Sequence, residues 1–223
     1  MNSGPDVWQW AASDRWPSFC LTLTRTKTSE EVLADYGADI SGARRLSLEA
    51  ALDTFPPNLG ETLLRAGQRG DWSFCYEERQ PMGYRSDVLG RLSTGTETVC
   101  VFSGGDGMRT VERWQDSQQI EQFEPGVEQT LAGNGPYELF RLIQTAVETV
   151  AVSDSRLVAA LYVVGRYTEV VLDRPTLDGQ LLTACLNAIP TQTTSQERPS
   201  LSPSARLRLG PPLGFKGRER PQS

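Results

Sequence analysis

The chain has 223 residues, of which 28 are acidic and 22 basic, so its net charge is −6 at pH 7, and it contains no histidine. The missing histidine excludes Ser-His-Asp and Cys-His nucleophile pairs and histidine-ligated metals, and it removes the commonest general base near neutral pH. Hydrophobic residues at 38% are near the globular norm and allow one domain of ordinary size with a sizeable core.

The first half of the chain alternates short helices and strands. Each helix start carries a Ser, Thr or Asp cap, and the strands are rich in apolar and β-branched residues. The predicted elements are a helical turn over 6–12, a strand over 19–25, a helix from a Thr28 or Ser29 cap to Gly37, a helix over 47–52, a turn over 61–66, a strand over 72–77 and a helix over 86–92.

The second half predicts a meander followed by helices. Strands over 98–102, 108–114 and 119–123 are joined by short, turn-rich links, and Glu124-Pro125-Gly126 is expected to end the sheet. Helices then follow over 137–152, 155–164 and 177–187. The sequence therefore predicts an α+β fold, an antiparallel meander sheet covered by helices on one side.

The last segment differs in composition from the rest. Residues 191–223 are rich in Ser, Thr, Pro, Gln and Arg and hold six basic and two acidic residues, a net charge of +4. Because the whole chain carries −6, residues 1–190 carry −10. We expect a single globular domain over 1–190 and a disordered basic tail over 191–223, which has too little apolar surface to offset chain entropy.

The sequence predicts a protein of the bacterial cytoplasm. No run approaches the roughly 18 consecutive apolar residues that cross a bilayer, and the N-terminus MNSGPDVWQW lacks the regions of a signal peptide. We expect a cytoplasmic protein that does not bind a membrane. Only Lys27 and Lys216 accompany 20 arginines, a ratio typical of GC-rich bacterial genes that leaves few positions for lysine chemistry.

The Gly-rich loop and the cysteines are best explained by structural roles. The Gly-rich loop SGGDGM over 103–108 lacks the following helix and the glycine spacing of a phosphate-binding loop, so it predicts a hairpin turn. The four cysteines have no C-x-x-C spacing and each sits in an apolar run, which predicts four buried free thiols and no metal site: Cys20, Cys75, Cys100 and Cys185.

Two sets of residues are candidates for function. Glutamates on or beside the strands could bind Mg²⁺ or act as acid and base if neighbouring strands bring two of them together. The alternative is that they lie on solvated faces. These residues are Glu77, Glu78, Glu97, Glu112, Glu121 and Glu124. All five tryptophans lie in the first 114 residues, and tryptophan is enriched in interface hot spots although it is more often core. The strand alternation turns Trp72 inward and leaves Trp10 and Trp114 as the outward-facing candidates for binding.

Several phrases occur in an order that resembles a group of uncharacterised, mainly actinobacterial proteins defined by a domain of unknown function: PSFCLTLTR, EEVLADYGAD, GDWSFCYEE, SDVLGRLSTGTETVCVF, FEPG and LDGQLLTACL. The resemblance spans about residues 7–189 and implies no activity or catalytic residues. It implies a small acidic α+β domain similar to immunity and conflict-system modules that bind a protein, by analogy of fold. One departure is LVAALYVVGRY, which stands where members often carry an acidic stretch, so a shared acidic surface is in doubt.

Three functions follow from these observations. We expect a non-enzymatic protein-interaction module, immunity-like or regulatory, that uses a free sheet face or the tryptophans and carries no cofactor. The alternative is a carboxylate- or Mg²⁺-dependent enzyme that acts on a small molecule. A third, weaker idea is nucleic-acid binding through the basic tail, since the acidic body repels nucleic acid.

Overall fold

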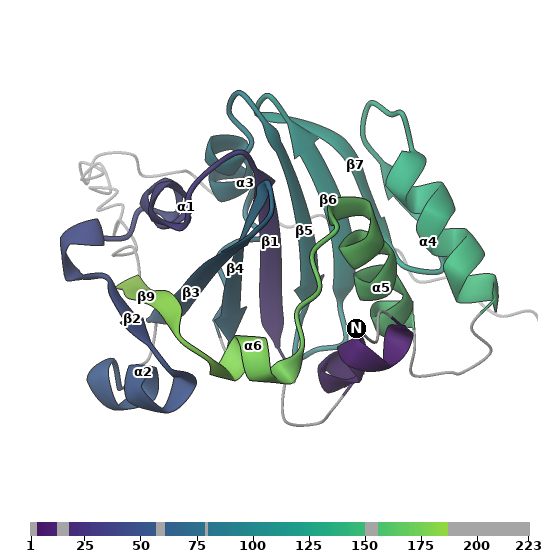
Figure 1. The fold of residues 1–223 in the computed structure, drawn as a ribbon. Coiled ribbons are helices and arrows are strands. Elements are labelled where there is room, and N and C mark those ends of the chain that lie inside the picture. The colour runs from purple at the N-terminus through teal and green to yellow at the C-terminus, as the bar shows by residue number, and fades with distance from the viewer. Residues whose placement is uncertain (1–3, 13–17, 57–60, 79, 150–155, 187–223) are drawn as a thin grey trace, which may run out of the picture. The chain divides into compact units, whose positions relative to one another are not determined.

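Nine strands of the described chain form one antiparallel sheet with the order β2-β9-β3-β4-β1-β5-β6-β7-β8 (Figure 1). The structure is a computed structural model that describes residues 4–12, 18–56, 61–78, 80–149 and 156–186. The strands are β1 (Phe19–Arg25), β2 (Arg44–Leu46), β3 (Thr62–Arg69), β4 (Trp72–Glu78), β5 (Glu97–Ser103), β6 (Arg109–Gln115), β7 (Gln118–Glu124), β8 (Val127–Ala132) and β9 (Leu181–Leu186).

Helices cover both faces of this sheet. One face packs against the 3-10 helix η1 (Pro5–Ala12) and helices α4 (Glu138–Thr149) and α5 (Arg156–Thr168), and the other against α1 (Ser29–Tyr36) and α3 (Ser86–Leu92). The shorter helices are η2 (Ile40–Gly42), α2 (Leu48–Thr54) and α6 (Arg174–Asp178). The predicted α+β class and antiparallel sheet are confirmed, whereas the prediction of helices on one side only is wrong.

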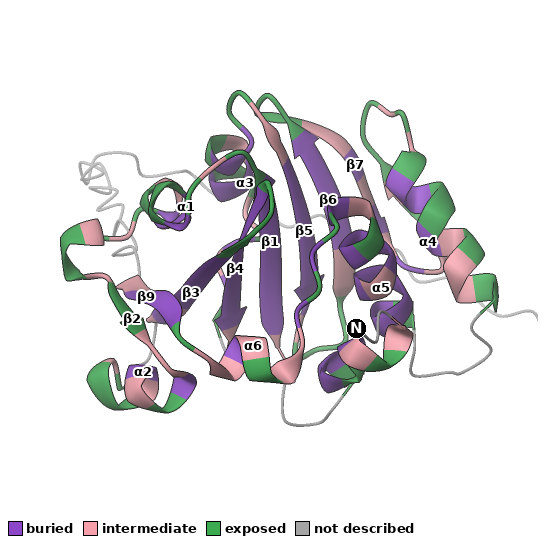
Figure 2. Cartoon of the chain, viewed as in Figure 1, coloured by how far each residue is buried: buried purple, intermediate pink, exposed green. Residues whose placement is uncertain are grey.

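The two faces of the central strands differ in chemistry, which explains this error. In β1, Phe19 and Leu23 point into the core beneath α4 and α5, while Thr22 and Thr24 point the other way and are equally buried. Small polar side chains along one side of a strand usually indicate a solvated face. Here they lie beneath α1 and α3, and Figure 2 shows β1, β4 and β5 buried along most of their length.

Local sequence signals set the boundaries of α1 and α2 as predicted, whereas α3 begins after Arg85 without the expected side-chain cap. The Thr28 hydroxyl accepts a hydrogen bond from the Glu31 N–H while the Glu31 carboxylate accepts from the Thr28 N–H, a capping box that starts α1. Gly37, in the left-handed region, ends the same helix. Ser47 caps α2 through the Ala50 N–H.

Two segments that predict helical structure are strands instead. Residues 61–66 are not a turn but lead into β3, and of the helix predicted over 177–187 the described residues 177–186 contain the end of α6 followed by β9. Arg65 of β3 is 2% exposed, and its guanidinium donates to the carbonyls of Leu177, Gly179 and Leu46. These hydrogen bonds join β3 to the segments that lead into β9 and out of β2.

The meander from β5 to β7 is confirmed, but the sheet does not end at residue 124. Residues 104–108 form the hairpin turn predicted between β5 and β6, closed by the Gly104 N–H donating to the Met108 carbonyl at 2.7 Å. After β7, Glu124 pairs with Val127, so Pro125 and Gly126 are the two central residues of a tight turn. Proline followed by a glycine with φ of 79° is typical of a type II turn, which returns the chain as β8.

The predicted tail over 191–223 lies outside the described residues. Its disorder, its nucleic-acid binding and the domain boundary at residue 190 therefore stay predictions. Within the described residues, no helix is long and apolar enough to cross a membrane.

Candidate functional site

Trp10 and Trp114 do not face outward, so that prediction is wrong. Trp10 is 9% exposed, packs against Phe19 and Tyr76 with ring centroids 5.4 and 5.6 Å away, and donates its indole N–H to the Leu172 carbonyl at 2.9 Å. Trp114 is 8% exposed in the other core. An indole ring has a large apolar area, and each of these two rings is buried in one of the two cores. The central strands β1, β4 and β5 are buried along most of their length, so they present no free face.

Two of the candidate glutamates meet, but around an arginine. Arg113 of β6 donates from Nε to Glu121 Oε1 at 2.7 Å and from Nη1 to Glu97 Oε1 at 3.4 Å. Glu121 is fully buried and also accepts the N–H groups of Leu139 and Phe140 at the start of α4. Glu121 is therefore an anchor between sheet and helix, because its oxygens are already engaged.

Glu77 lies on the opposite face, buried beneath α1. Its carboxylate accepts hydrogen bonds from the Tyr36 hydroxyl at 3.0 Å and from the N–H groups of Met82 and Gly83 at 2.6 and 2.9 Å. Burial raises the pKa of Glu77 to about 7, and the three donors act in the opposite direction. The group is 0% exposed, so it has no access to a substrate.

The remaining candidates are spread over the sheet. Glu112 is 5% exposed and accepts from the indole N–H of Trp114 at 2.9 Å, while Glu78 and Glu124 stand half-buried at strand ends. The predicted free thiols are confirmed, with Cys185 only half-buried, and Cys20 Sγ lies 3.4 Å from Cys100 Sγ. Among the described residues, no three His, Cys, Asp or Glu side chains are arranged to hold a metal ion.

A charged pocket of about 540 Å³ lies at one end of the sheet. Its floor is a row of side chains across adjacent strands, since Trp72 of β4 pairs with Arg25 of β1 on one side and with Arg69 of β3 on the other. Residues directly opposite in antiparallel strands share a face, so both arginines flank the Trp72 ring. Glu97, the first residue of β5, continues the row beyond Arg25.

The other wall of the pocket comes from the last turn of α5 and the residue after it. Tyr167, Thr168 and Glu169 line it. The Tyr167 hydroxyl donates to Glu97 Oε1 at 2.7 Å, and burial together with that carboxylate raises the pKa of Tyr167 to about 12. Tyr167 therefore keeps its proton at physiological pH and holds Glu97 in place.

Both arginines of the pocket are exposed, and neither forms a described ion pair, although the charge of Arg69 helps to lower the pKa of Asp173. No described carboxylate lies within ion-pair distance of the guanidinium of Arg25 or Arg69. By contrast, Arg113 behind the pocket is paired with two glutamates. Exposed guanidinium groups outside any ion pair are suited to bind a carboxylate or a phosphate.

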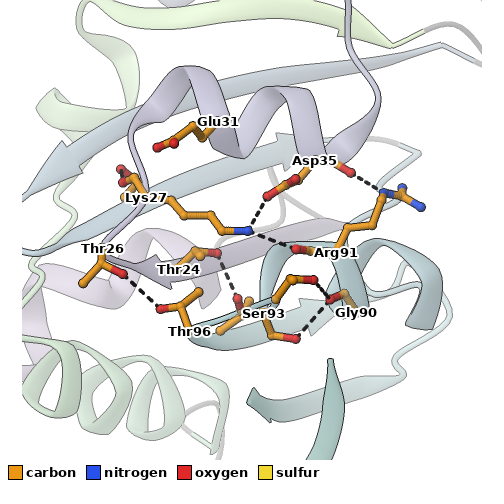
Figure 3. Close-up of polar contacts among 12 residues, drawn as sticks. Thr24, Thr26, Lys27, Glu31, Asp35, Gly90, Arg91, Ser93 and Thr96 are labelled. Carbon is orange, nitrogen blue, oxygen red and sulfur yellow. Dashed lines mark hydrogen bonds and ion pairs between the residues drawn. The ribbon is translucent and has the colours of Figure 1, made fainter. Parts of the chain in front are cut away.

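Hydrogen bonds beneath the pocket fix the end of β1 (Figure 3). Thr26 has φ of 60°, a conformation that β-branched residues rarely adopt, and its N–H donates to the Asp71 carbonyl at 2.7 Å. In Figure 3 its hydroxyl also contacts the Thr96 hydroxyl, at 3.3 Å. The Arg25 carbonyl accepts from the hydroxyls of Thr26 and Thr96. These contacts hold the turn that presents the Arg25 side chain.

Lys27, the residue after Thr26, connects this turn to α1 and α3. Its ammonium donates to Asp35 at 2.6 Å and to the Arg91 carbonyl at 3.0 Å, as drawn in Figure 3. The Ser73 hydroxyl donates to the Lys27 carbonyl at 2.6 Å. The strand end is thus tied to α1 and α3, so Arg25 stands on a rigid support.

Sequence reasoning missed this pocket for a definite reason. With residues 61–66 taken as a turn, β3 has no place beside β4, and Arg69 cannot be put opposite Trp72. The signal available was Arg69-Gly70-Asp71-Trp72, in which Gly70 has φ of 56° and the chain reverses between two strands. A hairpin at this position places Arg69 opposite Trp72, whereas the position of Arg25 depends on the separate pairing of β1 with β4.

Comparison with known proteins identifies the family of the chain. Residues 6–156 match a family of unknown function (DUF6461), and because the match covers more than half of the chain, the chain belongs to this family. No curated protein and no solved structure matches it. Arg25, Arg69 and Glu97 lie inside the matched region, whereas Tyr167 and Glu169 lie beyond it.

Proposed function

We propose that this member of the family is a non-enzymatic protein-interaction module whose partner places an acidic group in the pocket at the sheet end. The observation that carries the proposal is the pair Arg25 and Arg69, exposed on either side of Trp72 and in none of the described ion pairs. Arginine is enriched in interface hot spots and binds carboxylates in a bidentate way. The role in the cell would be regulatory or immunity-like.

The alternative of a carboxylate- or Mg²⁺-dependent enzyme receives less support from the described residues. Glu77 is sealed beneath α1, and Glu121 is held by Arg113 and by the start of α4. A general base must reach the proton that it removes. Of the candidate glutamates, Glu97 alone lines the charged pocket, beside two arginines that suit binding of an anion.

Charge reversal in the pocket tests the proposal. The full-length chain is used as bait in lysate of the native host, beside a variant that carries Arg25→Glu and Arg69→Glu. The matched control carries Arg44→Glu and Arg45→Glu on the edge strand β2, where both side chains are exposed, so that the net charge changes equally. We expect a partner at near-stoichiometric amount with the wild type and the control and its loss with the pocket variant.

The result that would contradict the proposal is a partner that the pocket variant retains at the wild-type amount. Both arginines are exposed, so we expect the melting temperatures of the pocket variant and the control to stay within a few degrees of the wild type. A pocket variant that is unfolded by circular dichroism is replaced by Arg25→Gln with Arg69→Gln, which removes the positive charge without reversing it.

A further inference from the structure

The charges that line the pocket at the sheet end are of both signs. Arg25 and Arg69 stand on the strands, and three carboxylates line the same space, from Asp71, Glu97 and Glu169. No ion pair joins either arginine to these carboxylates in the described structure. A purely anionic ligand would gain from two cations but would meet three negative groups at close range.

Of the three carboxylates that line the pocket, that of Glu97 is held by the most described hydrogen bonds. Its Oε1 accepts hydrogen bonds from Tyr167 at 2.7 Å and from Arg113 at 3.4 Å, and Glu97 is the first residue of the central strand β5. No described residue donates to its Oε2. One oxygen is therefore used to orient the group, and the other is an acceptor for which the described residues supply no donor.

We infer that the pocket binds a mixed-charge peptide segment, in which an acidic side chain engages Arg25 and Arg69 while a neighbouring basic side chain donates to Glu97. This inference rests on the proposed function, because it names the chemistry of the same partner. The volume of about 540 Å³ is within the range of ligand sites and is sufficient for two side chains of one segment. Glu97 is then a positioning and specificity residue for the basic side chain.

Blocked synthetic peptides of equal length test the inference with the full-length, ¹⁵N-labelled chain. The probes are an alternating Glu-Lys octapeptide, an all-Glu octapeptide and an all-Lys octapeptide, together with free glutamine as a small zwitterion. Nuclear magnetic resonance titration follows the Gly70 amide and the Trp72 indole, both of which belong to the pocket. We expect the Glu-Lys peptide to bind about fivefold more tightly than the all-Glu peptide, the size of one solvent-accessible ion pair.

Two variants separate this inference from the proposed function. Glu97→Gln keeps an acceptor for Tyr167 and Arg113 and should make the Glu-Lys and all-Glu peptides bind equally, whereas Glu128→Gln on the exposed strand β8 should leave the preference unchanged. Arg25→Glu with Arg69→Glu should weaken both peptides by about tenfold or more.

Three results would contradict all or part of this inference. An all-Glu peptide that binds as tightly as the Glu-Lys peptide, with no effect of Glu97→Gln, overturns the mixed-charge inference and leaves the acidic partner intact. Tighter binding of free glutamine than of either peptide overturns the assignment to a peptide. Peptide binding that the arginine reversal does not change, or no shift of the pocket resonances at millimolar peptide, overturns both this inference and the pocket as the partner's site.

Discussion

Glu77 is a carboxylic acid in the interior of the protein that faces groups which stay neutral. Burial raises the pKa of its neighbours Cys20 and Tyr36 well above their ordinary values, so neither supplies a charge at neutral pH. The pKa of Glu77 itself rises from 4.5 to about 7. The folded protein thus holds a proton that the unfolded chain releases over the same pH range.

This difference predicts a loss of stability as pH rises from about 4.5 to 7. Because the pKa is raised in the folded state, the contribution of Glu77 is fully present below pH 4.5 and is lost as pH rises through 7. The change amounts to about 3 kcal/mol in the free energy of unfolding, at 1.36 kcal/mol for each unit of pKa. Burial raises the pKa of Glu112 as well and acts in the same direction.

Urea unfolding of Glu77→Gln between pH 4 and 8 checks this prediction. The variant should show a flatter dependence on pH than the wild type, whatever its stability at one pH. Glu128→Gln, at an exposed position, should keep the wild-type dependence. Parallel curves for wild type and Glu77→Gln would show that Glu77 titrates normally in the folded state.

Helices α3 and α5 each contain a glycine, and the surroundings of the two glycines predict opposite effects of the same substitution. A Cβ on Gly90 of α3 would meet nothing within 4 Å, whereas one on Gly165 of α5 would lie 2.6 Å from the Trp8 ring and 2.8 Å from the Val170 carbonyl. Gly165 thus allows η1 and the chain after α5 to approach the helix closely.

We expect Gly90→Ala to raise the free energy of unfolding by about 0.5–1 kcal/mol, because alanine favours the helix and restricts the unfolded chain. Gly165→Ala should lower it by about 1–3 kcal/mol despite the same propensity gain, because the Val170 carbonyl is backbone and yields little. Urea unfolding of both variants at one pH measures the two changes. A stabilised Gly165→Ala protein would show that the contact with η1 is loose.

The elements that sequence reasoning identified are those with a local signal. The Thr28 capping box, Gly37 and the turn at residues 104–108 act within a few residues, so the sequence shows them directly. The run 181–186 is mostly apolar because its side chains enter both cores, Leu181 on one face and Leu182 and Ala184 on the other, and a short run of that kind does not distinguish a strand from a helix. Its identity depends on Arg65, more than 100 residues earlier in the chain.

The candidate site was less accessible to prediction than the fold. Glu97 was identified as a candidate, but its role depends on Tyr167, which is 70 residues away and on a different element. Neither Arg25 nor Arg69 indicates a binding site by itself, because an arginine at a strand end is usually a solvated side chain, and the hairpin signal over 69–72 places Arg69 only. Only the register of three strands brings both to Trp72.

At the scale of the whole fold, Arg113 joins the sheet to the helical layer that covers it. Its guanidinium contacts Glu97 of β5, Glu121 of β7, the Tyr167 hydroxyl of α5 and the Pro136 carbonyl before α4. Arg113 is 6% exposed and Glu121 is fully buried. Removal of the arginine would therefore leave a buried carboxylate without its cation.

We expect Arg113→Met to lower the free energy of unfolding by about 3–5 kcal/mol, since an uncompensated buried charge is more costly than the loss of the hydrogen bonds themselves. The double variant with Glu121→Gln should recover part of this loss, because the amide carries no charge and its oxygen still accepts from the start of α4. Urea unfolding of the wild type, both single variants and the double variant gives the coupling between the two residues. Additive losses would mean that Arg113 and Glu121 do not stabilise the fold as a pair.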